Sequence, residues 1–326
     1  MAFLIGFSGV VIAKANISAI AAAEEERHII VAFAGADENV KWGQANRRLY
    51  QKAFTQKENF LFKFSDAKGD DVRQKAQAEN FIFLNVDYLI INPISPDGWE
   101  KVLYSALSKK IPVFFAGGNV NVSDPELYAQ TVFSDYEQDG ESAATWLQKE
   151  LLTNQKLKEK DKINVFNITD SDVFKCEQRS QGFKNALEKT DNIVFYEEHG
   201  RGTADIAKRA ANYILADHEN IDVIICQSDA MLPGIAEALA AAGITTGENG
   251  DTILISYDGT QKAFEMLIDG TLNVSIEKTP DYTAVIKKSI EQLLQDPQAK
   301  LEKSVLLSDN MFLPATAEID SVGRWY

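Results

Sequence analysis

Nine residues of types that bind small polar molecules stand at or just past predicted strand ends, or at the starts of predicted helices. Planar carboxylates and guanidinium groups form paired hydrogen bonds with neighbouring hydroxyls, and aromatic faces stack on the C–H face of a sugar ring. The mixture therefore indicates a site for a small polyhydroxylated ligand. Its candidate residues are Phe33, Trp42, Asp66, Asn92, Asp135, Arg179, Asp229, Asp258 and Glu277.

Each candidate also has a simpler interpretation. Phe33 and Trp42 could be core residues, and Asp66, Asp135 and Asp258 could be helix caps or turn residues. Arg179 follows the start of a predicted helix, where the helix dipole disfavours a cation, so we expect it to have a specific partner. The shared position at strand ends, rather than any single residue, favours a common site.

No catalytic motif is recognisable. The chain lacks G-x-x-x-x-G-K-[ST], G-x-S-x-G, and a G-x-G-x-x-G after its first predicted strand. Its three histidines, His28, His199 and His218, do not have the spacing of metal ligands. We therefore expect no enzyme activity, no catalytic residues, no bound metal and no cofactor.

The elements that must position these candidates are best seen in residues 81–118. Here 86–91 and 111–115 form two apolar runs, separated by a helical pattern over 99–106. This is a βαβ crossover, the unit of parallel sheets. Ligands of such sheets bind beyond the carboxyl ends of the strands. A site is therefore expected next to residues 92–95 and 116–118.

The same alternation continues along the chain and predicts two α/β lobes of similar construction. No Pro/Gly/Ser-rich linker separates them, so several short crossings with a hinge are expected. The predicted strands are 29–33, 60–64, 86–91, 111–115, 163–166, 193–196, 221–226, 252–256, 272–276 and 305–307. The predicted helices are 42–54, 71–80, 99–106, 141–152, 173–189, 203–216, 230–242, 263–268 and 281–294.

The formal net charge of −15 argues against a nucleic-acid partner, because phosphate binding needs clustered Lys and Arg. Residues 1–23 have the form of a secretory signal peptide, with an apolar stretch over 2–13 and small residues before Glu24, although no basic residue precedes the stretch. A buried N-terminal strand is the alternative. The two cysteines, Cys176 and Cys226, could form a disulfide in an exported protein or remain buried thiols.

Several stretches resemble the periplasmic sugar-binding proteins of ABC transporters, of the ribose-binding type, with galactofuranose-binding proteins the nearest likeness. The stretches are VDYLIINPISPDGWEKVL, IPVF, RSQGFKNAL, QSDAMLPGIAEAL, SYDGTQKAFEML, NVSIEKTP and FLP, within 29–313. The resemblance implies the type I periplasmic binding protein fold, an α/β fold of two Rossmann-like lobes with parallel sheets joined by a three-crossover hinge. We expect 28–134 plus 259–297 in the N-terminal lobe and 135–258 plus 298–326 in the C-terminal lobe.

The resemblance also implies roles for single residues. Phe33 and Trp42 match aromatics of the N-terminal lobe that face the sugar, and Asp66 and Asn92 match cleft positions. Arg179 matches the arginine of the C-terminal lobe. The other matches are Asp135 at the first crossover, Asp258 as the hinge aspartate and Glu277 at the third crossover.

Three positions depart from the family pattern. Gly117 and Gly118 replace an Asp-Arg pair, Ser228 replaces an Asn, and Gly43 replaces an Arg. Two cationic side chains are thereby lost, which puts a simple furanose or pyranose in doubt and leaves room for a larger or substituted ligand.

The resemblance implies a monomeric periplasmic solute-binding protein that captures a sugar or polyol by closure of its lobes and delivers it to an ABC transporter permease. A receptor presenting the same ligand to a chemoreceptor or a histidine kinase is the main alternative. A repressor core is disfavoured because the chain lacks room for a helix-turn-helix ahead of Ile29. An enzyme on this fold is a further alternative.

Overall fold

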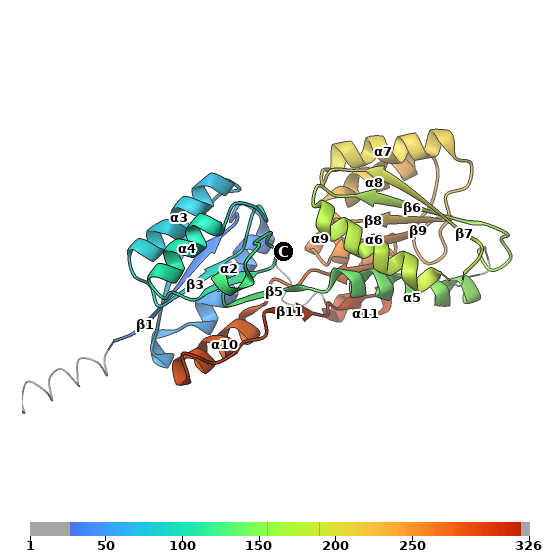
Figure 1. Cartoon of the computed structure of the whole chain (residues 1–326). Coiled ribbons are helices and arrows are strands. Elements are labelled where there is room, and N and C mark those ends of the chain that lie inside the picture. Colours follow the sequence, from blue (N-terminus) through green and yellow to red (C-terminus); the bar gives the residue numbers. More distant parts are fainter. Residues whose placement is uncertain (1–26, 155, 189, 321–326) are drawn as a thin grey trace, which may run out of the picture. The chain divides into compact units, whose positions relative to one another are not determined.

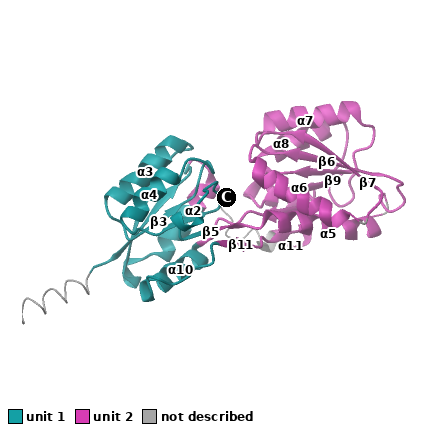
Figure 2. Ribbon diagram, in the orientation of Figure 1, with its two compact units in different colours: residues 1–38, 46–131, 283–303 teal, residues 39–45, 132–282, 304–326 magenta. Residues whose placement is uncertain are grey.

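The computed structural model describes residues 27–154, 156–188 and 190–320, so the expected signal peptide lies outside the described residues. Strands and helices alternate through most of the chain (Figure 1). The described part divides into two compact units, the first made of residues 27–38, 46–131 and 283–303 and the second of 39–45, 132–282 and 304–320 (Figure 2). The chain passes from unit to unit near 38, 45, 131, 282 and 303.

The first sheet has six strands in the order β11-β5-β4-β3-β1-β2, and β1 pairs in parallel with both β2 and β3. Its strands are β1 (Ile29–Gly35), β2 (Phe60–Asp66), β3 (Tyr88–Ile91), β4 (Val113–Ala116), β5 (Gln130–Ser134) and β11 (Ser304–Leu307). The helices along this part of the chain are α2 (Lys41–Ala53), α3 (Asp71–Phe83), α4 (Glu100–Ser108) and α10 (Thr283–Gln295).

The second sheet has the order β12-β10-β9-β8-β6-β7 and is parallel except for its two-residue edge strand β12. Its strands are β6 (Ile163–Thr169), β7 (Ile193–His199), β8 (Val223–Cys226), β9 (Ile253–Asp258), β10 (Val274–Glu277) and β12 (Met311–Phe312). The helices are α5 (Tyr136–Thr153), α6 (Val173–Leu187), α7 (Ala204–Asp217), α8 (Leu232–Ala241), α9 (Gln261–Ile268) and α11 (Pro314–Asp320).

Both faces of the second sheet are covered. Along β8 and β9, Ile224 and Leu254 belong to a buried core with residues of α7, α8 and α9, while Val223 and Ile253 belong to one with residues of α5 and α6. Successive side chains of a strand point to opposite faces, so a strand buried on both faces becomes a continuous apolar run. The polar side chains of this unit that could bind a ligand are therefore left to the strand ends.

The two-lobed α/β fold with parallel sheets is confirmed. The expected lobe boundary at residue 259 differs from the division found in the structure. Residues 259–282 lie in the second unit because β10 pairs with β9 and because Phe264 and Leu267 of α9 are buried in a core of that unit. Residues 298–303, expected in the C-terminal lobe, lie in the first unit.

Every strand and helix predicted from the pattern is present, with ends displaced by a few residues. Among the strands and α-helices, β5, β12 and α11 were not predicted, and α5 begins at Tyr136 rather than at 141. The start of α5 contains Asp139 and Gly140, which are weak helix formers. Acidic residues are favourable at a helix N-terminus, however, and Asp135 caps the helix there.

Candidate functional site

The candidate site lies at the carboxyl edge of the second sheet. Because β6, β8, β9 and β10 are parallel, their last residues meet at one edge, where Glu277 of β10 is paired with Asp258 of β9. The chain continues from these strands into Asp170, Gln227 and Lys278. This edge is where ligands bind in parallel α/β sheets.

Arg179 is the central cation of this edge, and its side chain is fully buried. Its Nε donates to Asp139 Oδ2 at 3.2 Å, and its Nη1 donates to the carbonyl of Gln227 at 3.3 Å. The guanidinium carbon lies 4.1 Å from the ring centroid of Tyr257 and 5.2 Å from that of Tyr136. These contacts fix the guanidinium plane, and the neighbouring carboxylates keep the pKa of Arg179 above its ordinary value despite its burial.

Close packing of α5 on α6 brings Asp139 and Arg179 together. A Cβ added at Gly140 would lie 2.0 Å from the backbone oxygen of Arg179, and one added at Gly182 would lie 1.9 Å from that of Glu137. Only glycine permits backbones to approach so closely. The two glycines therefore determine the position of the guanidinium.

Two polar atoms at this edge have unused hydrogen-bonding capacity. Among the described residues, neither Arg179 Nη2 nor Asp258 Oδ1 has a hydrogen-bond partner, although both atoms are buried. Asp258 Oδ1 lies 4.0 Å from Arg179 Nη1, and its other oxygen accepts from Ser228 Oγ at 2.8 Å. Buried polar groups without partners are rare in folded proteins, so a donor and an acceptor left free together indicate a ligand position.

The backbone of Asp258 supports this interpretation. Its φ of 114° is outside the range that a non-glycine residue normally adopts, and Gly259 follows at φ 68°. Such backbone strain costs about 1–3 kcal/mol and is concentrated at functional sites. Surrounding contacts, among them the hydrogen bond from Ser228 Oγ, keep Asp258 in this conformation at the strand end.

A second buried cation, Lys175, lies one helical turn before Arg179. Its Nζ donates to Asp170 Oδ2 at 2.7 Å, and the side chains are 5% and 12% exposed. Burial would lower the pKa of Lys175, but the charges of Asp258 and Asp170 raise it above the ordinary value. Conversely, the nearby ammonium lowers the pKa of Asp170 to about 2 although burial opposes this. Both groups are therefore charged at neutral pH.

Asp229, which follows β8, is also buried at this edge of the sheet. Its Oδ2 accepts from the Thr260 amide at 2.8 Å, and its Oδ1 accepts from Ser256 Oγ. Burial and the charge of Asp258 raise the pKa of Asp229 to about 7. The described contacts give Asp229 the role of joining the loops after β8 and β9.

Trp42 lies in the part of α2 that groups with the second unit. Its Nε1 donates to the carbonyl of Lys278 at 3.0 Å, and its ring packs against Tyr282 with a centroid separation of 6.4 Å. Lys278 Nζ lies 4.9 Å from the Trp42 ring centroid. Glu277, next to Lys278, is buried and accepts from Asn310 Nδ2 at 2.7 Å.

Three candidates belong to the first unit. Phe33 is 1% exposed and packs on Tyr50 with a centroid separation of 4.7 Å, which favours the core alternative for this residue. Asp66 Oδ1 accepts from the amides of Glu38 and Lys68. Asn92 Nδ2 donates to the Ala116 carbonyl at 2.8 Å and joins the ends of β3 and β4. Asp66 and Asn92 thus shape the carboxyl edge of the first sheet.

The remaining candidate, Asp135, is the N-cap of α5. Its Oδ1 accepts from the amide of Gln138 at 3.1 Å. Its own amide donates to the carbonyl of Leu307 at 2.8 Å. The cap alternative therefore accounts for this residue.

The structure adds Asp139, Lys175, Tyr257 and Lys278 to the site. Lys175 could have been found from the sequence, because it lies four residues before Arg179 on the predicted helix and therefore on the same face. Asp139 could not, because its position depends on the close packing of two helices. At the family departures, Gly117 has a φ of 79° and Ser228 bonds to Asp258 as described.

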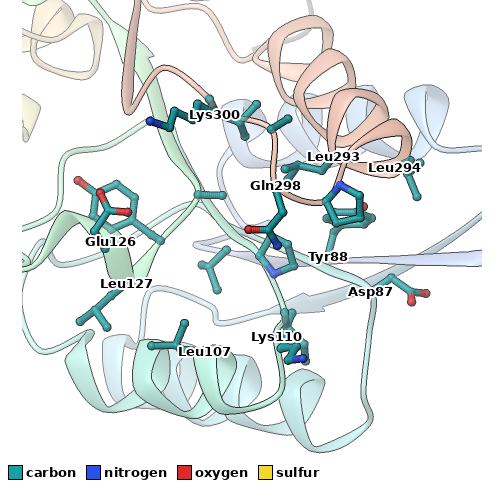
Figure 3. Close-up of a pocket in the computed structure, with 18 of the residues that line it drawn as sticks. Asp87, Tyr88, Leu107, Lys110, Glu126, Leu127, Leu293, Leu294, Gln298 and Lys300 are labelled. Carbon is teal, nitrogen blue, oxygen red and sulfur yellow. The ribbon is translucent and has the colours of Figure 1, made fainter.

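A large pocket of about 1050 Å³ lies elsewhere, within the first unit (Figure 3). It is lined by the amino ends of β1, β3 and β4, at Ile29, Tyr88 and Val113. Leu293 and Leu294 of α10 and Leu107 of α4 also line it. The pocket is therefore at the edge of the sheet opposite to the carboxyl ends, and it contains none of the predicted site residues.

Both cysteines are free and buried, as in the alternative without a disulfide. The part of the chain that the structure describes holds no group of three or more His, Cys, Asp or Glu side chains arranged to bind a metal. Across the described ranges, no helix combines the length and apolar character needed to cross a membrane.

Comparison with known proteins gives a consistent assignment. The model of the periplasmic binding protein domain matches residues 29–296. The galactofuranose-binding protein YtfQ of Escherichia coli is 27% identical over 295 residues, which are 89% of each chain. The fructose import binding protein FruE of Bifidobacterium longum is 27% identical over 292 residues, 86% of this chain and 84% of FruE.

Solved structures agree. A galactofuranose-binding protein superimposes with a TM-score of 0.76 at 26% identity, covering 90% of this chain and 97% of the other. The binding component of an arabinose ABC transporter from Shewanella sp. ANA-3 gives a TM-score of 0.78 at 22% identity over 90% of this chain and 95% of the other, a likeness that shows the fold alone.

Proposed function

The chain belongs to the periplasmic binding protein domain family, and from this premise we propose that it is a periplasmic solute-binding protein for a sugar or sugar-like polyol, serving an ABC transporter. The relatives named above are binding proteins, and two of them carry galactofuranose-binding or fructose import names. On this proposal the protein binds its ligand without changing it, acts as a monomer and hands the ligand to a permease.

One observation supports the sugar class more than any other. The guanidinium Nη2 of Arg179 and the carboxylate Oδ1 of Asp258 are a buried donor and a buried acceptor that have no hydrogen-bond partner among the described residues. A sugar hydroxyl can accept from the guanidinium while donating to the carboxylate. A single hydroxyl would therefore satisfy both groups. The two hydrogen bonds would be charge-assisted, and such bonds are about twice as strong as neutral ones.

Aromatic groups surround this position. Tyr257 and Tyr136 hold the guanidinium, and Phe174 at the start of α6 is 38% exposed and contacts Tyr136 edge-on at 6.5 Å. An exposed aromatic face beside polar groups is the arrangement that receives the C–H face of a sugar. Phe174 therefore joins Arg179 and Asp258 in the proposed ligand site.

The proposal is tested by thermal shift of the purified protein against pentoses, hexoses and furanosides. Ligand that binds only the folded state raises the free energy of unfolding by mass action, by about 2.7 kcal/mol at a hundredfold excess over Kd. The melting temperature rises as a result. Closure of the two units on the ligand, which the resemblance implied, predicts a smaller radius of gyration in solution scattering with the same sugar. If none of these compounds changes the melting temperature, the sugar class is rejected.

A further inference from the structure

The carboxyl edge of the second sheet holds three cationic side chains, and only two of them form an ion pair within the described residues. Lys175 pairs with Asp170 at 2.7 Å, and Arg179 pairs with Asp139 at 3.2 Å. Lys278 makes no ion pair with any carboxylate of the described residues. Its Nζ lies over the face of Trp42, 4.9 Å from the ring centroid.

Lys278 contacts Trp42 through its backbone as well as its side chain. Its carbonyl accepts from Trp42 Nε1 at 3.0 Å, so the indole is fixed against the backbone of the residue whose ammonium packs on it. The side chain is only half-buried. Burial, more than the charge of Lys175, lowers the pKa of Lys278, while the charges of Asp258 and Asp172 oppose this shift.

The neighbouring carboxylates are engaged elsewhere. Glu277 accepts from Asn310, Asp172 caps α6 through the Lys175 amide, and Asp309 Oδ1 accepts from the Thr279 amide. Two carboxylate oxygens of this group, Asp258 Oδ1 and Asp309 Oδ2, nevertheless have no hydrogen-bond partner within the described ranges. The edge therefore offers one ammonium without an ion-pair partner among the described residues and, separately, the free acceptor Asp258 Oδ1, which can face a hydroxyl or another donor.

We propose, as an extension of the proposed function, that the ligand is a sugar acid whose carboxylate pairs with Lys278 while its hydroxyls bind Arg179 Nη2 and Asp258 Oδ1. The fully buried, unpartnered guanidinium nitrogen of Arg179 supplies the independent sign of a ligand at this edge. A single unpaired ammonium balances a monoanion. A phosphate dianion would keep one charge uncompensated beside the Asp258 carboxylate, so a carboxylate is favoured over a phosphate.

The experiment uses matched sugars that differ only in the acidic group. Calorimetric titration would compare D-galactose with D-galacturonate and D-glucose with D-glucuronate, with D-galactose 6-phosphate as the dianionic probe. The proteins are the full chain, Lys278→Met, Lys278→Gln and the control Lys208→Met. Lys208 is an exposed residue of α7 that pairs with Glu237 and lies outside the site.

We expect the acid of at least one pair to bind about tenfold more tightly than its neutral partner, as one charge-assisted contact predicts. The preference should disappear in both Lys278 variants and persist in Lys208→Met, and the phosphate should bind less tightly than the carboxylate. The melting temperatures of the ligand-free variants report whether they fold. Lys278→Gln removes the charge but keeps a polar side-chain end, so it serves as the test if Lys278→Met perturbs the fold.

The outcomes separate this inference from the proposed function. A neutral sugar that binds as tightly as its acid, or an acid preference that survives in a folded Lys278 variant, overturns the inference and leaves sugar binding intact. If D-galactose 6-phosphate binds more tightly than the sugar acids, the proposed carboxylate is overturned in favour of a phosphate. Failure of every sugar, neutral and acidic, to bind the unmodified protein overturns both proposals.

Discussion

The guanidinium of Arg179 and the carboxylate of Asp139 form an ion pair with Nε and Oδ2 3.2 Å apart, and their side chains are only 0% and 2% exposed. Burial raises the pKa of Asp139 to about 7 although Arg179 opposes the shift. Removing one member of such a pair leaves an uncompensated buried charge. The pair therefore maintains the folded state as well as the orientation of the guanidinium.

Replacement of Arg179 by Lys keeps the charge but removes the forked donor. We expect sugar affinity to fall about 10- to 100-fold, since about 1.5–3 kcal/mol is lost with a charge-assisted hydrogen bond. Calorimetric titration with the sugar that gives the largest thermal shift measures this. Arg209→Lys, at an exposed position of α7, is the control and should bind normally. Equal affinities in the two variants would exclude Arg179 from the site.

The close contact of α5 with α6 predicts a strong effect of Gly140→Ala. The added methyl would lie 2.0 Å from the backbone oxygen of Arg179. Relief of this clash requires movement of a helix backbone, which costs free energy. We expect the free energy of unfolding to fall by about 1–3 kcal/mol, as for other overpacked sites. Denaturant titration should show this loss, whereas Ser142→Ala in the same helix should be nearly neutral. A Gly140→Ala protein as stable as the unmodified one would contradict the packing described here.

Asp229 predicts a pH dependence of stability. Its pKa is about 7 in the folded protein against an ordinary value of 3.8, so between about pH 4 and pH 7 the folded state binds more protons than the unfolded chain. The free energy of unfolding therefore falls as pH rises through this window, by up to about 1.4 kcal/mol per pH unit for one group. Asp139 and Asp309 contribute with the same sign, because burial raises their pKa values to about 7 and about 6.

Denaturant titration of Asp229→Asn at several pH values tests this dependence. The variant should lose part of the negative slope between pH 4 and pH 7, while Asp191→Asn at an exposed position should keep all of it. An unchanged slope in the Asp229 variant would show that this carboxyl is ionised in the folded protein throughout that range.

The two cysteines should be unreactive in the folded protein. Both are buried, and burial raises the pKa of the Cys176 thiol to about 11, so the thiolate is scarce at neutral pH. A thiol reagent at pH 8 should therefore label neither residue before unfolding and both afterwards, without any reductant. Labelling that requires a reductant after unfolding would reveal a disulfide instead.

The sequence predicts the fold well because the strands of both sheets are apolar runs at regular intervals. The runs at 86–91 and 111–115, with a helical pattern between them, predict β3, α4 and β4 directly. The two-residue β12 carries too short a pattern to be recognised. The boundary at 259 was misplaced because strand pairing, which puts β10 beside β9, is a non-local property.

The candidate site was predicted in part. Arg179 and Asp258 are adjacent at a strand edge, as expected from residues that follow parallel strands. Phe33 and Asp135 have local roles, in packing and in capping, that residue type alone does not distinguish from ligand binding. Asp139 and Lys278 were missed because their importance arises from tertiary contacts with Arg179 and Trp42.

The central claim is that a hydroxylated ligand binds at the carboxyl edge of the second sheet, and a crystal structure tests it most directly. The protein would be crystallised with the sugar that raises its melting temperature most. We predict a sugar hydroxyl within about 3 Å of both Arg179 Nη2 and Asp258 Oδ1, the usual hydrogen-bond distance. A sugar bound instead in the pocket of Figure 3, with those two atoms still unpartnered, would contradict it.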